Sequence, residues 1–91
     1  MLNSDIEADV ICKFTRDEGL IPLKVRFPDD EGVEQEYKIL GYKETGAATR
    51  INGVILGPRS FLCKINVYNR EVVINLIYFQ QEEKWVVRRS N

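Results

Sequence analysis

The serines and cysteines, which act as nucleophiles in many enzymes, are Ser4, Ser60, Ser90, Cys12 and Cys63. Such a nucleophile is normally activated by a neighbouring base, most often histidine, and the sequence contains no histidine. No spacing of lysines or carboxylates matches a substitute base. We therefore expect a protein that is not an enzyme and that uses no cofactor.

The two cysteines are too few for a structural metal site. Structural zinc normally takes four nitrogen or sulfur ligands, and this chain offers two thiols and no imidazole. A thiol on an apolar strand face packs as a small hydrophobe. We expect Cys12 and Cys63 to be free, buried and without metal.

An acidic run, DDEGVEQE, is the other candidate for metal chemistry. Its carboxylates are Asp29, Asp30, Glu31, Glu34 and Glu36. Hard cations take clustered carboxylate oxygens, but this spacing does not match a calcium-binding loop. Because charged residues are common at turns, the sequence favours a solvated hairpin turn over a weak cation site.

Basic side chains recur in the first half of the chain and suggest a surface for nucleic acid. Lys13, Lys24, Arg26 and Lys38 fall on the outward face of three consecutive expected strands, and Tyr42 follows on the same face. Small β-barrels hold single strands with basic and aromatic side chains. One aromatic is fewer than stacking platforms use, and basic residues on strands also deter edge pairing. Weak single-stranded nucleic-acid binding is therefore an alternative function.

These side chains must be positioned by β-strands, because apolar and polar residues alternate along most of the chain. In the first two segments the residues expected to face inward are Ala8, Val10, Cys12, Phe14, Ile21, Leu23, Val25 and Phe27. The run VVINLIYF, residues 72–79, is apolar on both faces, which is typical of a central strand or a tightly curled barrel. We expect Trp85, Phe61, Val25 and Ile74 to share one core.

The connections are short and contain turn residues, so neighbouring strands must be antiparallel. Asn69-Arg70 predicts one tight turn. The predicted fold is all-β: one domain over residues 1–91, an antiparallel meander of six to seven strands in a closed or nearly closed barrel. A strongly curled open sheet is the alternative. Residues 1–7 are expected to be a frayed N-terminus.

Residues 43–59 form the only long connection, and we expect a long loop or an extra hairpin there. Asn52-Gly53 between apolar residues is a strong hairpin signal. Long loops on a rigid scaffold often carry binding sites. The candidate partner surface consists of Arg50, Ile51, Val54, Ile55 and Leu56.

Charge and hydropathy narrow the classes of partner. The net charge is −1, which favours neither nucleic acid nor an anionic membrane. The first ten residues lack the pattern of a secretory signal, and no window approaches the ~20 apolar residues of a membrane span. We therefore expect a cytoplasmic protein that does not bind membranes.

Three motifs resemble a group of small proteins from Clostridia and related Gram-positive bacteria. They are IPLKVRFPDDEG at 21–32, FLCKI at 61–65 and KWVV at 84–87. The group shares a proline–leucine–basic–x–arginine–aromatic strand before an acidic turn, a later aromatic–x–cysteine strand and a tryptophan in the last strand. Residues 43–59 depart from its pattern. The resemblance implies a bacterial origin and a common architecture, and it brings no active site.

These observations predict a small β-barrel binding module whose partner is another protein or a second copy of the chain. Single-stranded nucleic acid bound on the basic face is the alternative. A small-molecule carrier that uses the barrel interior is a third and less supported possibility.

Overall fold

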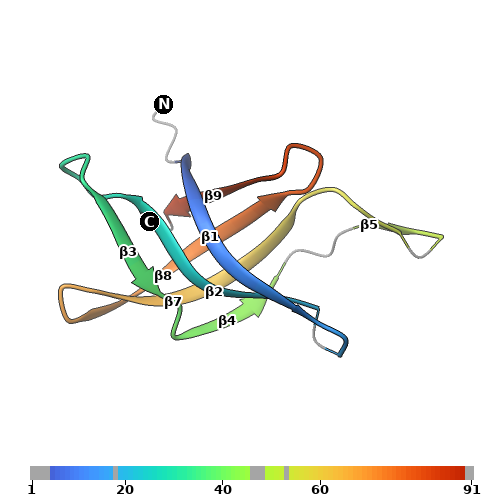
Figure 1. The fold of residues 1–91 in the computed structure, drawn as a ribbon, viewed down its shortest axis with the longest axis horizontal. Coiled ribbons are helices and arrows are strands. Elements are labelled where there is room, and N and C mark those ends of the chain that lie inside the picture. The colour runs from blue at the N-terminus through green and yellow to red at the C-terminus, as the bar shows by residue number, and fades with distance from the viewer. Residues whose placement is uncertain (1–4, 18, 46–48, 53, 90–91) are drawn as a thin grey trace.

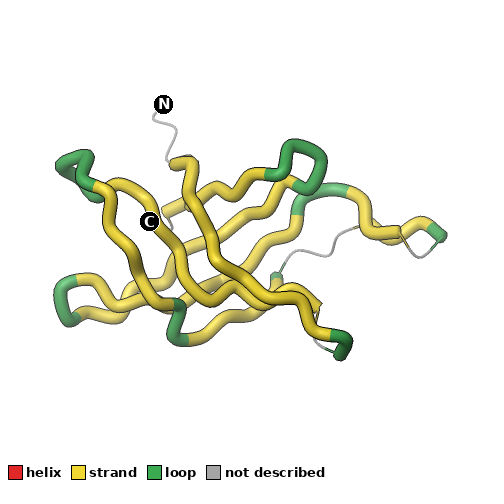
Figure 2. The backbone as a smooth tube through the Cα atoms, in the orientation of Figure 1, coloured by secondary structure: helices red, strands yellow, loops and turns green. Residues whose placement is uncertain are grey.

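The computed structural model describes residues 5–17, 19–45, 49–52 and 54–89 of the chain. These residues form strands and turns, and none of them lies in a helix (Figures 1 and 2). Among them there is consequently no helix that could cross a lipid bilayer. The strands are β1 (Asp5–Thr15), β2 (Gly19–Pro28), β3 (Glu34–Lys38), β4 (Gly41–Glu44), β5 (Thr49–Ile51), β6 (Val54–Leu56), β7 (Arg59–Val67), β8 (Arg70–Phe79) and β9 (Lys84–Arg89).

Seven strands form one antiparallel sheet in the order β3-β2-β1-β9-β8-β7-β4. The sheet consists of two three-stranded meanders, β1–β2–β3 and β7–β8–β9. They are joined where β1 pairs with β9, from Asp5 opposite Arg88 to Ala8 opposite Trp85. The sheet is strongly curled (Figure 1). This confirms the all-β antiparallel meander. A closed barrel is wrong, because the sheet remains an open half-barrel.

Backbone hydrogen bonds connect the two sheet edges where the chain passes from β3 to β4. The Ile39 N–H donates to the Leu23 carbonyl over 2.9 Å, and the next N–H, of Leu40, donates to the Lys64 carbonyl over 2.8 Å. The chain therefore leaves the β2 edge and joins the β7 edge within two residues. Among the described strands, β3 pairs with β2 alone and β4 pairs with β7 alone, so neither short strand closes the gap between the two sheet edges along its length.

The core lies on the concave side of the curled sheet. Val25, Phe61, Ile65, Leu76 and Val87 are fully buried. The four residues expected to share a core do so, which confirms that prediction. An apolar core of this kind supplies most of the stability of a small domain.

A register shift between β1 and β2 explains why Leu23 does not face inward as expected. Ile11 lies opposite Lys24, but Cys12 lies opposite Pro22, so Leu23 is the extra residue of a bulge. A bulge changes which side chains face inward. As a result Pro22 is buried, while Leu23 is 38% exposed.

Phe14 was also expected to face inward, and it is 74% exposed. It lies near the end of β1, opposite Leu20 of β2. In the part of the chain that the structure describes, β9 pairs with residues 5–8 of β1, so β2 is the one strand that pairs with β1 at Phe14.

Turns and ends differ in detail from the expectations. The β7–β8 turn is centred on Tyr68 and Asn69, at φ 50° and 62°, with Val67 opposite Arg70. This is the geometry of a two-residue type I′ turn, one residue earlier than predicted. The segment expected to be frayed includes residues 5–7, which belong to β1; residues 1–4 lie outside the described residues.

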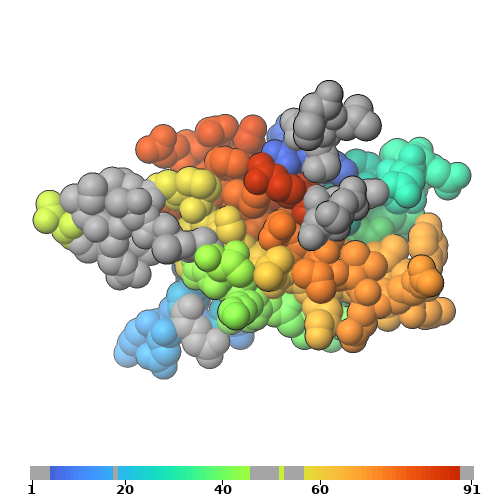
Figure 3. Space-filling model, turned by 180° about the vertical axis from the view of Figure 1, so that it is seen from behind, coloured from blue at the N-terminus to red at the C-terminus, as the bar shows by residue number. Residues whose placement is uncertain are grey.

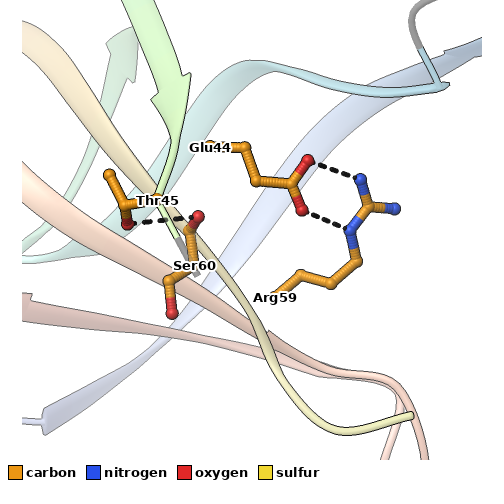
Figure 4. A network of polar contacts seen from close by, with 4 residues as sticks. All are labelled: Glu44, Thr45, Arg59 and Ser60. Carbon is orange, nitrogen blue, oxygen red and sulfur yellow. Dashed lines mark hydrogen bonds and ion pairs between the residues drawn. The ribbon is translucent and has the colours of Figure 1, made fainter. Parts of the chain in front are cut away.

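Residues 43–59 contain the two-stranded hairpin β5–β6, in which Ile51 lies opposite Val54. The ends of this segment are held together by the contacts in Figure 4. Arg59 donates two hydrogen bonds to the Glu44 carboxylate, over 2.8 and 2.9 Å, and the Thr45 hydroxyl donates to the Ser60 carbonyl over 3.5 Å. The Thr45 N–H also donates to this carbonyl, over 2.8 Å. These contacts join β4 to β7 at the two ends of the segment that contains the hairpin.

Candidate functional site: a cleft between two hairpin tips

A cleft of about 480 Å³ lies between the tips of the β2–β3 and β7–β8 hairpins. The two tips diverge at one end of the molecule (Figure 1), and the space-filling view shows them in teal and orange at that end (Figure 3). The volume is in the range of ligand-binding clefts. The lining residues are Phe27, Asp29, Asp30, Glu31, Tyr37, Ile65, Val67, Tyr68, Val72, Val73 and Ile74.

The floor of the cleft is the end of the hydrophobic core. Phe27, Ile65 and Ile74 are buried core residues that also line the cleft. Tyr37 of β3 packs beside Phe27, with ring centroids 5.1 Å apart. A ligand in the cleft therefore meets a rigid apolar surface.

One wall is the end of the β7–β8 hairpin, which extends beyond the neighbouring strands. The pairing of β4 with β7 goes no further than Lys64, and the pairing of β9 with β8 begins at Ile74. Beyond these points Tyr68, Val72 and Val73 are 83%, 38% and 47% exposed. Exposed apolar side chains gathered in one place are typical of an interaction surface.

Tyr68 combines this exposure with an unusual backbone. A positive φ is uncommon for a residue other than glycine, and rarer still for a bulky one. Tyr68 occupies the first of the two central positions of the type I′ turn and is one of the residues that line the cleft. Asparagine or glycine would adopt the positive φ of this position at a lower energetic cost than tyrosine does.

The opposite rim is the acidic β2–β3 turn. The Asp29 carboxylate accepts hydrogen bonds from the Glu31 N–H over 2.9 Å, the Val33 N–H over 3.0 Å and the Gln35 side chain over 3.2 Å. The Val33 N–H, followed by those of Glu31 and Gln35, lowers the pKa of Asp29 below its usual value. The rim is thus negatively charged, and no lysine or arginine is among the residues that line the cleft.

The hydrogen bonds of Asp29 and Asp5 should make stability depend on acid pH. The Arg88 side chain lowers the pKa of Asp5 much as the turn lowers that of Asp29, both from an unperturbed value of 3.8. A carboxylate with a lowered folded-state pKa stabilises the fold above its unfolded pKa, and this contribution is lost as pH falls through the folded pKa. We therefore expect the free energy of unfolding to decrease as pH is lowered below 3.8.

Urea unfolding at a series of pH values measures this effect, with Asp29→Asn as the comparison. The stability difference between the wild type and this variant should be largest above about pH 4 and should shrink toward about pH 2. A difference that stays constant over the whole range would contradict a contribution from the Asp29 charge.

The acidic run is not arranged as a metal site. Among the described residues, no three Asp, Glu or Cys side chains are placed to share an ion. The Asp29 oxygens are directed instead at the turn that they stabilise.

The basic residues of β2 and β3 lie together, but with carboxylates between them. Lys24 lies opposite Lys38 and is 3.5 Å from Glu36. Arg26 lies 3.2 Å from Asp9 and 3.9 Å from Glu34. This face of the sheet is mixed in charge rather than uniformly basic.

The other two residues of the expected basic surface lie apart from this group. Lys13 is on β1 beyond the register shift, opposite Ile21. Tyr42 is on β4 opposite the buried Cys63, with its ring 6.4 Å from that of Phe61. The aromatic residue therefore faces the core side of the sheet and is not interleaved with the basic side chains.

The candidate partner surface on residues 43–59 is described only in part. The backbones of Arg50, Ile51, Val54, Ile55 and Leu56 belong to β5 and β6, and their side chains lie outside the described residues. In Figure 1 this hairpin projects from the end of the molecule opposite the cleft.

The sequence pattern does not predict the cleft, although it contains two of its parts. These are the acidic run and the strand that is apolar on both faces, and nothing in their local patterns indicates that they lie on two sides of one opening. The signal that could have connected them is Tyr68 beside Asn69, an aromatic residue in a tight turn directly before exposed valines.

Comparisons of the chain with protein-family models, curated proteins and solved structures gave no match. The resemblance to the Gram-positive bacterial group thus stays a prediction. A functional assignment depends on the chemistry of the cleft.

Proposed function

We propose that this protein is a non-enzymatic binding module that holds a protein ligand in the cleft between the β2–β3 and β7–β8 hairpins. The observation that carries the proposal is the pair of exposed side chains Tyr68 and Val72, which line the cleft above a floor of core residues. Burying these side chains against a partner is favourable by roughly 25 cal/mol per Å² of apolar surface. The proposal includes a bacterial origin, as the sequence resemblance implies, and a cytoplasmic setting, as expected from the hydropathy of the sequence.

The cleft is a better candidate than the two alternative sites. The basic side chains of Lys24 and Arg26 lie within 4 Å of carboxylates, and Tyr42 is not beside them, which weakens the case for single-stranded nucleic acid. Core side chains such as Phe61 and Leu76 occupy the concave side of the sheet. This favours the cleft over the interior as the place for a ligand.

Selection from a phage-displayed library of random peptides tests the proposal. Peptides selected on the wild-type protein should bind Tyr68→Ala at least about tenfold more weakly, because an aromatic anchor is lost. Phe14→Ala is the matched control, since it removes an aromatic ring that is similarly exposed but lies outside the cleft. This variant should bind the peptides as the wild type does.

Backbone amide shifts in nuclear magnetic resonance spectra locate the bound peptide. The largest changes should fall on the cleft residues. Equal binding to both variants, changes confined to β5–β6, or the absence of any selected peptide would each contradict the proposed site. Peptide binding in the cleft should also be much less sensitive to salt than nucleic-acid binding, which would weaken steeply.

A further inference from the structure

One side of the cleft is an unpaired strand edge. The Ile39 N–H bonds to the Leu23 carbonyl, so these two residues form a hydrogen-bonded pair of the β2–β3 ladder. Hydrogen-bonded and non-hydrogen-bonded pairs alternate in an antiparallel ladder. Glu34, Glu36 and Lys38 are therefore the residues whose backbone N–H and C=O groups point away from β2.

No strand among the described residues pairs with this outer edge of β3. It faces β7, and the two strands approach each other near the point where the chain passes from β3 to β4. Toward the hairpin tips, residues 65–67 of β7 pair with β8 on one side, and no described strand pairs with them on the other, because β4 pairs no further than Lys64. The cleft thus opens between two strand edges with which no described strand pairs.

Extending the proposed function, we propose that the ligand is an extended peptide segment that adds to the outer edge of β3 as an antiparallel strand. Exposed sheet edges bind peptides in this way, with affinity from main-chain hydrogen bonds and specificity from alternate side chains. On β3, Gln35 and Tyr37 are half-buried while Glu34, Glu36 and Lys38 are exposed. An added strand alternates in the same way, so every second side chain enters the apolar cleft.

The charge of the cleft determines which peptide fits. Asp29, Asp30 and Glu31 are at the tip, and no basic residue lines the cleft. β3 begins at Glu34, beside this tip, and runs away from it to Lys38. An antiparallel peptide runs in the opposite direction, so its C-terminal end lies beside the acidic turn. The ligand is therefore an extended segment with apolar residues at alternate positions and basic residues at its C-terminal end.

The Glu36→Pro variant tests this binding mode. Proline removes the one N–H of Glu36, which points away from β2, so the β2–β3 ladder is preserved; proline is tolerated at such edge positions. The Glu36→Gln control removes the same charge and keeps the N–H. The probes are synthetic seven-residue peptides with valine or tyrosine at alternate positions, threonine between them and two C-terminal lysines. Isothermal titration calorimetry measures their affinity.

Glu36→Pro should bind these peptides roughly tenfold more weakly than Glu36→Gln, because a hydrogen bond is lost and a carbonyl of the ligand is left without a donor. Methylation of the peptide nitrogens that face β3 should cause a similar loss in the wild-type protein, and methylation of the opposite nitrogens should not. This second measurement remains decisive if Glu36→Pro does not fold. Moving the two lysines to the N-terminus should also weaken binding.

Other outcomes separate this inference from the proposed function. Equal binding to Glu36→Pro and Glu36→Gln, with binding still lost in Tyr68→Ala, would overturn strand addition and leave the cleft as the site. Binding that is unaffected by Tyr68→Ala would overturn both. Equal affinity with lysines at either end would overturn the antiparallel orientation. A dimer in sedimentation experiments that Glu36→Pro dissociates would show that a second copy of the chain occupies the edge, contrary to the proposal.

Discussion

Replacing Trp85 with alanine should lower the free energy of unfolding by about 3–5 kcal/mol, as large-to-small substitutions in well-packed cores do. The Trp85 ring is 8% exposed, stacks on Tyr78 with centroids 4.7 Å apart and lies 6.0 Å from Phe61. Removing it leaves a cavity in the middle of the aromatic part of the core. Such a loss is a large share of the stability of a small domain.

Urea unfolding measures this loss, with Phe14→Ala as the control. Because the Phe14 ring is largely exposed, its removal should change stability by no more than about 0.5 kcal/mol. Trp85 is the chain's single tryptophan, so native emission should be blue-shifted and should move to longer wavelength on unfolding. Solvent-like native emission, or a loss equal to that of the control, would contradict the position of Trp85.

The Cys63 thiol should react with thiol reagents at least about a thousandfold more slowly in the folded protein than in urea, since the thiolate is the reactive form. Cys63 is 1% exposed, and burial raises its pKa from 9.0 to about 12. Near neutral pH this change alone lowers the thiolate fraction about a thousandfold. Limited access to the sulfur slows the reaction further.

Cys12 provides the comparison within the same molecule. It is half-buried, and burial also raises its pKa, but it is more accessible than Cys63. The Cys12→Ser variant isolates the reaction of Cys63, and the Cys63→Ala variant isolates that of Cys12. Cys12 should be labelled first. Rapid labelling of Cys63 in the native state would mean that this part of the core is open to solvent.

The strands with regular alternation were predictable because their pattern is local. In β7, Phe61, Cys63 and Ile65 are buried while Leu62 and Lys64 are exposed, as the period of two requires. The two apolar faces of β8 predict a strand with a neighbour on each side, and β8 lies between β7 and β9. These elements depend on neighbouring residues in sequence, which is the information that a pattern contains.

Which side chains of β2 face the core was not predictable in the same way. In the pattern IPLKVRF every second residue, from Ile21 to Phe27, is a large apolar one, yet Leu23 is the extra residue of a bulge and Pro22 is buried. A bulge depends on which residue of β1 lies opposite. That pairing is a non-local property, so a single segment does not reveal it.

The cleft combines both kinds of information. The acidic turn and the apolar β8 run can be seen in the sequence, and so can the Tyr68-Asn69 pair. Their position on two sides of one opening has two causes. The pairing of β4 with β7 ends at Lys64, and the pairing of β9 with β8 ends at Ile74. The chain also crosses from the β2 edge to the β7 edge at Ile39 and Leu40. The sequence by itself therefore determined that this is an antiparallel β-protein with a core around Trp85. Only the tertiary structure decided that the sheet stays open and where it exposes an edge, because strand lengths and register depend on contacts between residues that are far apart in the chain.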